Sequence, residues 1–325
     1  MVNLHTKYAG LSLRNPIIVG SSGLTRKAER NKEFEKAGAG AIVLKSLFEE
    51  QIEMQGDVLI DPYDFPEAND YVRQYVKANQ ISQYLTLIQE SKALCNIPII
   101  ASINCYKADA WIDFAKQIEE AGADALELNI FALQTDLMYN FNSNKQSYID
   151  IVNRVKDKIS IPIIIKIGKY FSNIPDIVDA LKVNGANGVV LFNRFYQPDI
   201  DINSLQLVSG NVFSNHSDLS DTIRWTALVS GKVPGIDISA STGVHDWEDV
   251  VKCLLAGAST VQMCSALYTH GGGIITQILT CMEEWMNHSN FQSVSQFRGR
   301  LNYANIPDPG VYERSQFMKY FSNRD

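Results

Sequence analysis

The stretch of sequence from residue 162 to residue 193 reads PIIIKIGKYFSNIPDIVDALKVNGANGVVLFN. It begins with an apolar run behind Pro162, continues through a segment with apolar residues at helical spacing, and reaches a second apolar run behind Gly185. Proline is tolerated at the first residue of a strand, where its missing N–H breaks no ladder. Glycine suits the left-handed turn that ends a helix. The stretch therefore predicts a unit of strand, helix and strand.

The same unit occurs four times along the chain. Its prolines and glycines are Pro16 and Gly38, Pro98 and Gly122, Pro162 and Gly185, and Pro234 and Gly257. The step from proline to glycine is 22, 24, 23 and 23 residues. Four such units predict eight strands that alternate with helices, and hence a parallel sheet. A doubly wound sheet alternates in the same way, but eight strands in four near-equal quarters favour a closed (β/α)8 TIM barrel.

The chain length fits one such barrel with long loops. At about 150 residues per domain, 325 residues suggest two domains. No linker rich in Gly, Ser or Pro separates two halves, so we expect residues 1–325 to form a single domain. The excess length falls in predicted insertions after strands 2, 4 and 6, at residues 46–78, 131–145 and 193–217. All three follow strands and therefore lie at the face where barrel enzymes carry their active sites.

The composition excludes several classes of protein. With 29 basic and 36 acidic residues, the chain has no basic footprint for nucleic acid or for an anionic membrane. The 5 cysteines form no CxxC pair, which is typical of a reduced, cytoplasmic protein without a disulfide framework. No apolar run reaches the roughly 18 residues that a membrane-spanning helix needs, and the first residues lack the apolar stretch of a signal peptide.

Two lysines lie at the predicted C-terminal ends of apolar strands. Lys45 ends the strand AIVLKS, and Lys166 follows four apolar residues in PIIIKI. A lysine in such a place is unfavourable unless an anion or a polar group meets it. Either a structural ion pair or a bound anion would satisfy it, and the presence of two such lysines favours the bound anion.

Amides lie at the ends of two further strands. In ALELNI, Glu127 and Asn129 share one face with Ala125, and this polar face must point inward because the helices need the apolar one. Asn193 follows the sixth predicted strand. Amides donate and accept hydrogen bonds together, which suits the edge of a heterocycle. A polar network that braces the barrel mouth is the alternative interpretation.

Small residues follow the seventh and eighth predicted strands. The first group is Ser239, Ala240, Ser241, Thr242 and Gly243, and the second contains Cys264 and Ser265. Backbone N–H groups in such loops form an anion site, and barrels often bind phosphate after strands 7 and 8. A tight turn also needs small residues, but their position predicts a phosphate site.

Together these motifs resemble dihydroorotate dehydrogenase of the soluble class 1 type. The matching segments are LRNPIIVGSSG from residue 13, IVLKS from 42, LELN from 126, PIIIKI from 162 and GASTVQMCSALYTHGGG from 257. They keep the family's order over nearly the whole chain. The resemblance implies an FMN-binding (β/α)8 barrel that works in pyrimidine biosynthesis. In that family, hydride passes between a small heterocyclic CH–CH substrate and flavin N5.

The resemblance also implies roles for residues of this chain. It places four residues at the flavin ring, namely Gly20, Ser21, Lys45 and Ser46. It implies that the cofactor phosphate binds to backbone N–H groups, namely those of Ala240, Ser241, Thr242, Gly243, Cys264 and Ser265. Asn129 would contact flavin or substrate, and Asn193 and Lys45 would contact substrate. Lys166 would contact the cofactor and have a catalytic role, because its charge would stabilise the reduced flavin.

The segment after the fourth strand departs from the family. The family motif Leu-Asn-x-Ser-Cys-Pro-Asn carries the base in its cysteine, whereas here Ala132 occupies that position. Thr135 and Tyr139 are candidate substitute bases, and Gln134 is a candidate substrate-binding amide. DPYDFPEANDY, from residue 61, also replaces a substrate element of the family. The substrate is therefore dihydroorotate or another small reduced heterocycle.

Two other functions stay open on the sequence. A lyase or aldolase would use Lys166 as a Schiff-base nucleophile on a phosphorylated substrate. A flavin-binding protein without catalysis is the second alternative. The histidines show no spacing typical of a metal site. The electron acceptor would be fumarate, a nicotinamide or a partner protein. The resemblance also implies a homodimer.

Overall fold

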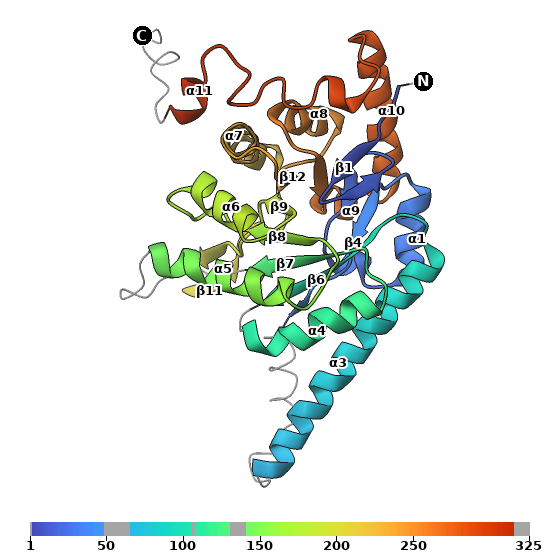
Figure 1. Cartoon of the computed structure of the whole chain (residues 1–325), viewed down its shortest axis with the longest axis vertical. Helices are drawn as coiled ribbons and strands as arrows, with labels where there is room; N and C mark the ends of the chain where they lie inside the picture. The colour runs from blue at the N-terminus through green and yellow to red at the C-terminus, as the bar shows by residue number, and fades with distance from the viewer. Residues whose placement is uncertain (1, 49–65, 106–107, 131–140, 315–325) are drawn as a thin grey trace.

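Eight parallel strands close into a barrel, as the fourfold pattern predicts (Figure 1). In the computed structural model, the described residues are 2–48, 66–105, 108–130 and 141–314. The barrel strands are β3 (Ile17–Val19), β4 (Ala41–Val43), β6 (Ile99–Cys105), β7 (Ala125–Ile130), β8 (Ile163–Ile167), β9 (Gly188–Leu191), β12 (Asp237–Ser241) and β13 (Thr260–Met263). Pairing of β13 with β3 and of β4 with β6 completes the circle, and the short β5 (Leu47–Phe48) adds to β6.

Three of the four repeat prolines and all four glycines do what the sequence predicts, whereas β12 begins three residues after Pro234, at Asp237. β3, β6 and β8 each begin directly after a repeat proline, and the carbonyl groups of these prolines accept hydrogen bonds from the neighbouring strands. The missing proline N–H therefore breaks no ladder bond. The four glycines have φ values of +112°, +94°, +102° and +115°, which is the left-handed conformation that ends a helix.

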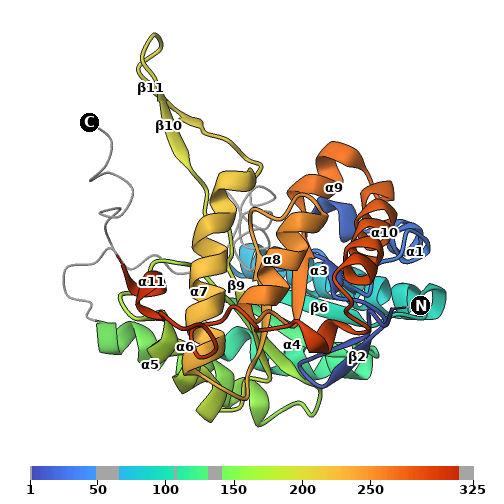
Figure 2. The same cartoon turned by 90° about the horizontal axis from the view of Figure 1, so that it is seen from above.

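Helices surround the barrel (Figures 1 and 2). They are α1 (Ala28–Lys36), α3 (Pro66–Leu94), α4 (Ala108–Glu120), α5 (Phe141–Lys156), α6 (Ile174–Val183), α7 (Leu219–Lys232), α8 (Trp247–Ala256) and α10 (Gly273–His288). The short α9 (Ser265–His270) follows β13, and α11 (Gly310–Glu313) lies near the C-terminus. Over the part of the chain that the structure describes, none of the helices is long and apolar enough to cross a membrane.

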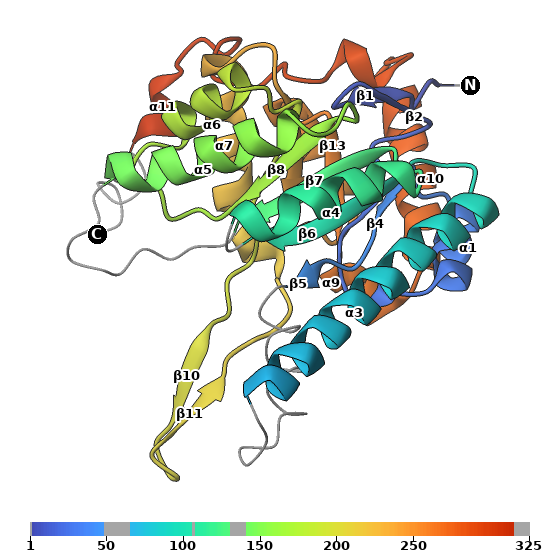
Figure 3. The same ribbon diagram turned by 60° about the horizontal axis from the view of Figure 1, so that its bottom comes forward.

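The insertions are more regular than the sequence suggests. Residues 66–78 were expected in a loop but form the first turns of α3, because Pro66 suits a helix start and no glycine or proline follows within the helix. In the insertion after β9, β10 (Pro198–Asp201) and β11 (Gln206–Ser209) form an antiparallel hairpin. This hairpin projects away from the barrel (Figure 3). In the expected insertion after β7, residues 141–145 already belong to α5.

Two apolar cores lie on the two faces of the barrel sheet. Leu126 and Leu128 of β7 point outward and pack among the helices, whereas Ala125 belongs to a smaller cluster inside the barrel. The alternation predicted for this strand is therefore confirmed. A hairpin of β1 (Thr6–Tyr8) and β2 (Leu11–Leu13) closes the N-terminal end of the barrel, where the side chains of Tyr8 and Leu13 are fully buried.

Candidate functional site

A cavity lies at the C-terminal ends of the barrel strands. Its empty volume, including the space open to solvent, is about 710 Å³, within the range of small-molecule sites. The lining includes eight residues singled out from the sequence, namely Ser21, Lys166, Asn193, Ser241, Thr242, Gly243, Cys264 and Ser265. The structure thus brings residues from the ends of β3, β8, β9, β12 and β13 to one place.

A chain of hydroxyl groups begins at Ser21, which lines the cavity. Ser21 Oγ accepts a hydrogen bond from the N–H of Ser46 at 2.8 Å, and the two hydroxyl groups lie 2.9 Å apart. Ser46 Oγ is also 2.8 Å from Ser102 Oγ on β6. Tyr84 of α3 donates to the Ser102 carbonyl group at 2.8 Å, and burial raises the pKa of this phenol. These bonds fix the loops after β3 and β4 relative to β6.

Lys45 lies two residues beyond β4 and is half-buried. Its Nζ is 4.2 Å from the centre of the Phe48 ring, a cation–π distance. Burial lowers the pKa of this amine, because it disfavours the charged form. Within the described ranges no carboxylate pairs with it, so an anionic ligand would be a favourable neighbour.

Lys166 lies near the end of β8 and is only 6% exposed. Its Nζ donates to Oε1 of Gln262 on β13 at 3.2 Å. No carboxylate in the described part of the chain forms an ion pair with this ammonium group. The ion pair that would be the structural explanation for Lys166 is therefore not found among the described residues.

Asn129 of β7 and Asn193, just beyond β9, are joined at the barrel mouth, where β8 lies between their strands. Asn193 Nδ2 donates to Asn129 Oδ1 at 2.8 Å. No described residue bonds to Asn129 Nδ2 or to Asn193 Oδ1. The pair therefore presents one free donor and one free acceptor, the combination that an amide-like edge of a heterocycle requires.

The loop after β12 turns its backbone N–H groups inward. Thr242 and Gly243 have φ values of +80° and +87°. Thr222 Oγ1 donates to the carbonyl groups of Ser241 and Thr242, so the N–H group of each of these peptides points the opposite way. Among the described residues, none accepts a bond from the N–H of Thr242, Gly243 or Val244. Three adjacent unpaired donors fit a phosphate group.

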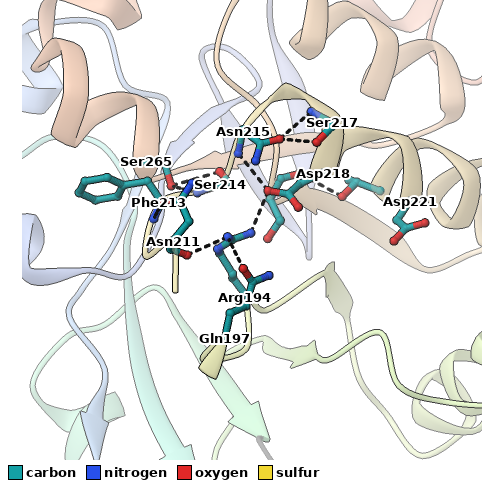
Figure 4. Close-up of polar contacts among 12 residues, drawn as sticks. Arg194, Gln197, Asn211, Phe213, Ser214, Asn215, Ser217, Asp218, Asp221 and Ser265 are labelled. Carbon is teal, nitrogen blue, oxygen red and sulfur yellow. Dashed lines mark hydrogen bonds and ion pairs between the residues drawn. The ribbon is translucent and has the colours of Figure 1, made fainter. Parts of the chain in front are cut away.

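The hydroxyl group of Ser265 is held by the chain that returns from the β10–β11 hairpin (Figure 4). Ser214 donates to Ser265 Oγ from its N–H at 3.0 Å and from its Oγ at 3.1 Å. Arg194, which precedes the hairpin, is joined to the chain that follows it. Its side chain pairs with Asp218 at 2.8 Å and donates to the Asn211 carbonyl group at 3.0 Å. The sequence reasoning missed Arg194 and Ser214, although Arg194 directly follows Asn193.

Gly20 contacts Cys264 of the cavity lining, whereas Ala240 lies away from the cavity. A Cβ atom on Gly20 would be 2.7 Å from Cys264 Sγ, so a glycine is needed where these chains meet. Burial raises the pKa of the Cys264 thiol, which therefore stays protonated at neutral pH. The Ala240 side chain is fully buried in the outer core, and its backbone pairs within the sheet rather than lining the cavity. Ala132, Gln134, Thr135 and Tyr139 lie outside the described residues.

A group of metal-ligand type lies behind the β12 loop. His216 Nδ1, a carboxylate oxygen of Asp246 and one of Asp249 lie within 4.8 Å of one another. Asp249 already accepts bonds from His216 at 2.8 Å and from the N–H of His245 at 3.0 Å. These contacts account for the buried Asp249 carboxylate without a metal ion.

Comparison with known proteins gives a consistent picture over almost the whole chain. The family described as Dihydroorotate dehydrogenase matches residues 3–286. The chain is 29% identical over 317 residues to the protein named dihydroorotate dehydrogenase B (NAD(+)), catalytic subunit, of Thermoplasma volcanium, covering 92% of this chain and 98% of that protein. It is 27% identical over 306 residues to a putative dihydroorotate dehydrogenase A (fumarate) of Aeropyrum pernix, covering 93% and 98%.

Proposed function

Because this chain belongs to the dihydroorotate dehydrogenase family, we propose that it is an FMN-dependent oxidoreductase acting on a CH–CH group of a small heterocycle. The observation that carries the proposal is the cavity itself, where unpaired N–H groups of the β12 loop share one space with Lys166 and Asn193. A single barrel domain over residues 1–325 would hold the whole site.

FMN fits the donors of this cavity. The N–H groups of Thr242, Gly243 and Val244 would bind its phosphate, and the Ser265 hydroxyl lies beside them. Lys166 would lie at the ring, with Ser21 and Ser46 on its other side. When bound, FMN supplies the hydride acceptor N5, while the protein supplies orientation and electrostatics. Lys166 holds a positive charge at the cavity floor, which favours a ring that gains negative charge.

The substrate would bind at the amides and at Lys45. The free Nδ2 of Asn129 and the free Oδ1 of Asn193 match a ring with adjacent carbonyl and N–H groups. Lys45 lacks a carboxylate partner among the described residues and would attract a substrate carboxylate. Dihydroorotate has all of these groups, and another small reduced heterocyclic acid shares them.

The proton acceptor would come from the segment that follows β7. Ala132 occupies the usual base position and carries no titratable group. Thr135 or Tyr139 would remove the substrate proton, and Gln134 would add a substrate-binding amide. Substitution of both Thr135 and Tyr139 should therefore slow flavin reduction by substrate but leave FMN content unchanged.

The names of the relatives and the surface of the hairpin bear on the electron acceptor and the partners. Relatives are named for NAD(+) and for fumarate, and several are named as catalytic subunits, so a nicotinamide, fumarate or a partner protein would accept the electrons here. A homodimer is supported by the exposed apolar side chains of the hairpin, which include Ile200, Ile202, Leu205 and Leu207. The cysteine pattern supports a cytoplasmic location. Sedimentation equilibrium of the wild type and of a Leu205→Ser, Leu207→Ser variant would test the dimer.

The experiment that tests the function is anaerobic mixing of the purified protein with dihydroorotate. We expect a yellow protein that releases FMN on denaturation and whose flavin absorbance falls after mixing. A colourless protein that borohydride links to a phosphorylated carbonyl compound would instead support the Schiff-base alternative through Lys166. A yellow protein that neither dihydroorotate nor related heterocycles reduce would support the non-catalytic alternative, for which Ala132 is the motivating observation.

A further inference from the structure

Three buried polar side chains form a line across the inside of the barrel. Lys166 of β8 donates from Nζ to Gln262 Oε1 at 3.2 Å, and Gln262 Nε2 donates to Glu127 Oε2 at 2.6 Å. Their exposed fractions are 6%, 2% and 0%. The line begins at the cavity, which Lys166 and Gln262 both line, and ends at Glu127 in the barrel interior.

The chemistry of Gln262 makes this line directional. A glutamine side chain has an acceptor end and a donor end, and its neighbours decide which end points where. The Glu127 carboxylate accepts hydrogen bonds and offers none, so it selects the Nε2 end. The Oε1 end is then left for Lys166, whose ammonium group can only donate. Reversal would place an NH2 group against an ammonium and an oxygen against a carboxylate.

Within the described residues, Lys166 and Glu127 are linked by hydrogen bonds through Gln262. No described carboxylate forms an ion pair with Lys166, and Glu127 Oε1 has no hydrogen-bond partner there. A buried, charge-assisted hydrogen bond is stronger than a neutral one. Loss of the amide would therefore leave both charged groups without their buried partner.

We propose that Gln262 is a positioning residue that holds the Lys166 ammonium at the cavity floor, and that Glu127 acts through it by fixing the orientation of its amide. This inference rests on the proposed FMN function. The chain Glu127–Gln262–Lys166 then sets where the positive charge lies relative to the bound ring. Its effect appears in the preference of the protein for reduced over oxidised FMN.

The test measures that preference as the ratio of the dissociation constants for oxidised and reduced FMN, obtained by anaerobic redox titration of the holoprotein. Lys166→Met and Gln262→Leu should each lower the preference for reduced FMN, with about a tenfold loss for Lys166→Met. A contact with a charged group contributes about 1.5 kcal/mol, which corresponds to roughly a tenfold change in a dissociation constant. Gln262→Leu should add nothing further in the Lys166→Met background, because it acts through the lysine.

Thr260→Val is the matched control. Thr260 lies on the same face of β13 as Gln262 and is fully buried, and its hydroxyl has no partner in the described structure. This variant should keep the wild-type ratio. If Gln262→Leu fails to fold, Gln262→Met carries the same test.

The outcomes separate the inference from the proposed function. A wild-type protein that does not bind FMN overturns both. Two results with a wild-type protein that binds FMN would overturn the inference alone. In the first, Gln262→Leu leaves the ratio unchanged. In the second, the effects of Gln262→Leu and Lys166→Met multiply in the double variant. Equal effects of Thr260→Val and Gln262→Leu would also overturn it, because they would indicate general loosening of β13.

Discussion

The two sides of the cavity offer hydrogen-bonding groups of different kinds. On the side of β12, the backbone N–H groups of Thr242, Gly243 and Val244 are the donors. On the side of β7 and β9, the side chains of Asn129 and Asn193 carry the hydrogen-bonding groups. A backbone site tolerates a change of side chain as long as the chain keeps its path, whereas a side-chain site changes specificity with each substitution. This difference would let the proposed cofactor site persist while the segment after β7 departs from the family at Ala132.

The largest effect should follow a change in the chain path at Gly243. Its φ is +87°, and a Cβ atom there would lie 2.4 Å from the backbone nitrogen of Leu219. Gly243→Ala should displace the phosphate-binding N–H groups and weaken FMN binding by about a hundredfold, the loss expected for two hydrogen bonds to a charged group. Titration of the apoprotein with FMN, followed by fluorescence, measures this loss.

Gly235→Ala is the control for backbone strain at Gly243. Gly235 has the same φ of +87°, but a Cβ atom there meets only Lys182 Cε at 3.9 Å. This variant should lower the free energy of unfolding by about 1 kcal/mol and leave FMN affinity unchanged. Wild-type FMN affinity in Gly243→Ala would contradict a backbone phosphate site at this loop.

Asn193→Ala should separate the substrate side from the cofactor side. It removes the free Oδ1 and the bond to Asn129, so substrate affinity should fall about tenfold, while FMN content stays at the wild-type level. The measurement is the concentration of dihydroorotate that half-saturates the rate of flavin reduction. Asn184→Ala, at the end of α6, serves as the control. Loss of FMN with unchanged substrate affinity would contradict the assignment.

The pH dependence of stability should reveal the burial of Lys45. Burial lowers the pKa of this amine below 10.5 in the folded protein. Between the lowered pKa and 10.5 the unfolded chain binds more protons than the folded one, so this group makes stability rise with pH. Lys45→Met should remove that rise in the apoprotein, as measured by urea unfolding from neutral to alkaline pH.

The control for Lys45→Met is Lys27→Met, which removes a charge from an exposed position. Lys27→Met should leave the slope of stability against pH unchanged. Parallel curves for the wild type and Lys45→Met would show that Lys45 titrates alike in the folded and unfolded chains.

The smallest effect should come from Ser265→Ala. It removes the hydroxyl that Ser214 contacts at 3.0 Å and 3.1 Å, but it leaves the backbone path in place. FMN should dissociate about fivefold faster, the factor expected for one neutral hydrogen bond. Stopped-flow measurement of FMN release tests this, with Ser220→Ala on the exposed face of α7 as control. A change as large as that of Gly243→Ala would end the distinction between backbone and side-chain recognition.

The fold could be predicted because its signals are local. Pro162 and Gly185 each act on the backbone within one or two residues, and the period between such pairs is visible without any knowledge of contacts. The start of α3 was missed because residues 66–78 lack a clear apolar periodicity, although they contain good helix formers. Here intrinsic propensity outweighed the pattern.

The lining of the cavity could be predicted where residues lie at or just beyond the C-terminal ends of strands. Lys166 and Asn193 were found in this way, because parallel strands end at one face. Gln262 and Arg194 were missed, since their importance depends on partners far away in sequence, such as Glu127 and Asp218. No local sequence pattern shows which side chains of opposite barrel strands meet inside the barrel.

The hairpin of β1 and β2 closes the opposite end of the barrel with Tyr8 and Leu13. Among the described residues, the β1–β2 end offers no way in, and the floor of the cavity is reached from the C-terminal mouth. An electron donor and a small-molecule acceptor that both need this floor must enter and leave in turn. Steady-state kinetics with such a pair should follow a double-displacement order, with parallel double-reciprocal lines, and each product should compete with the other reactant for the same open form of the protein.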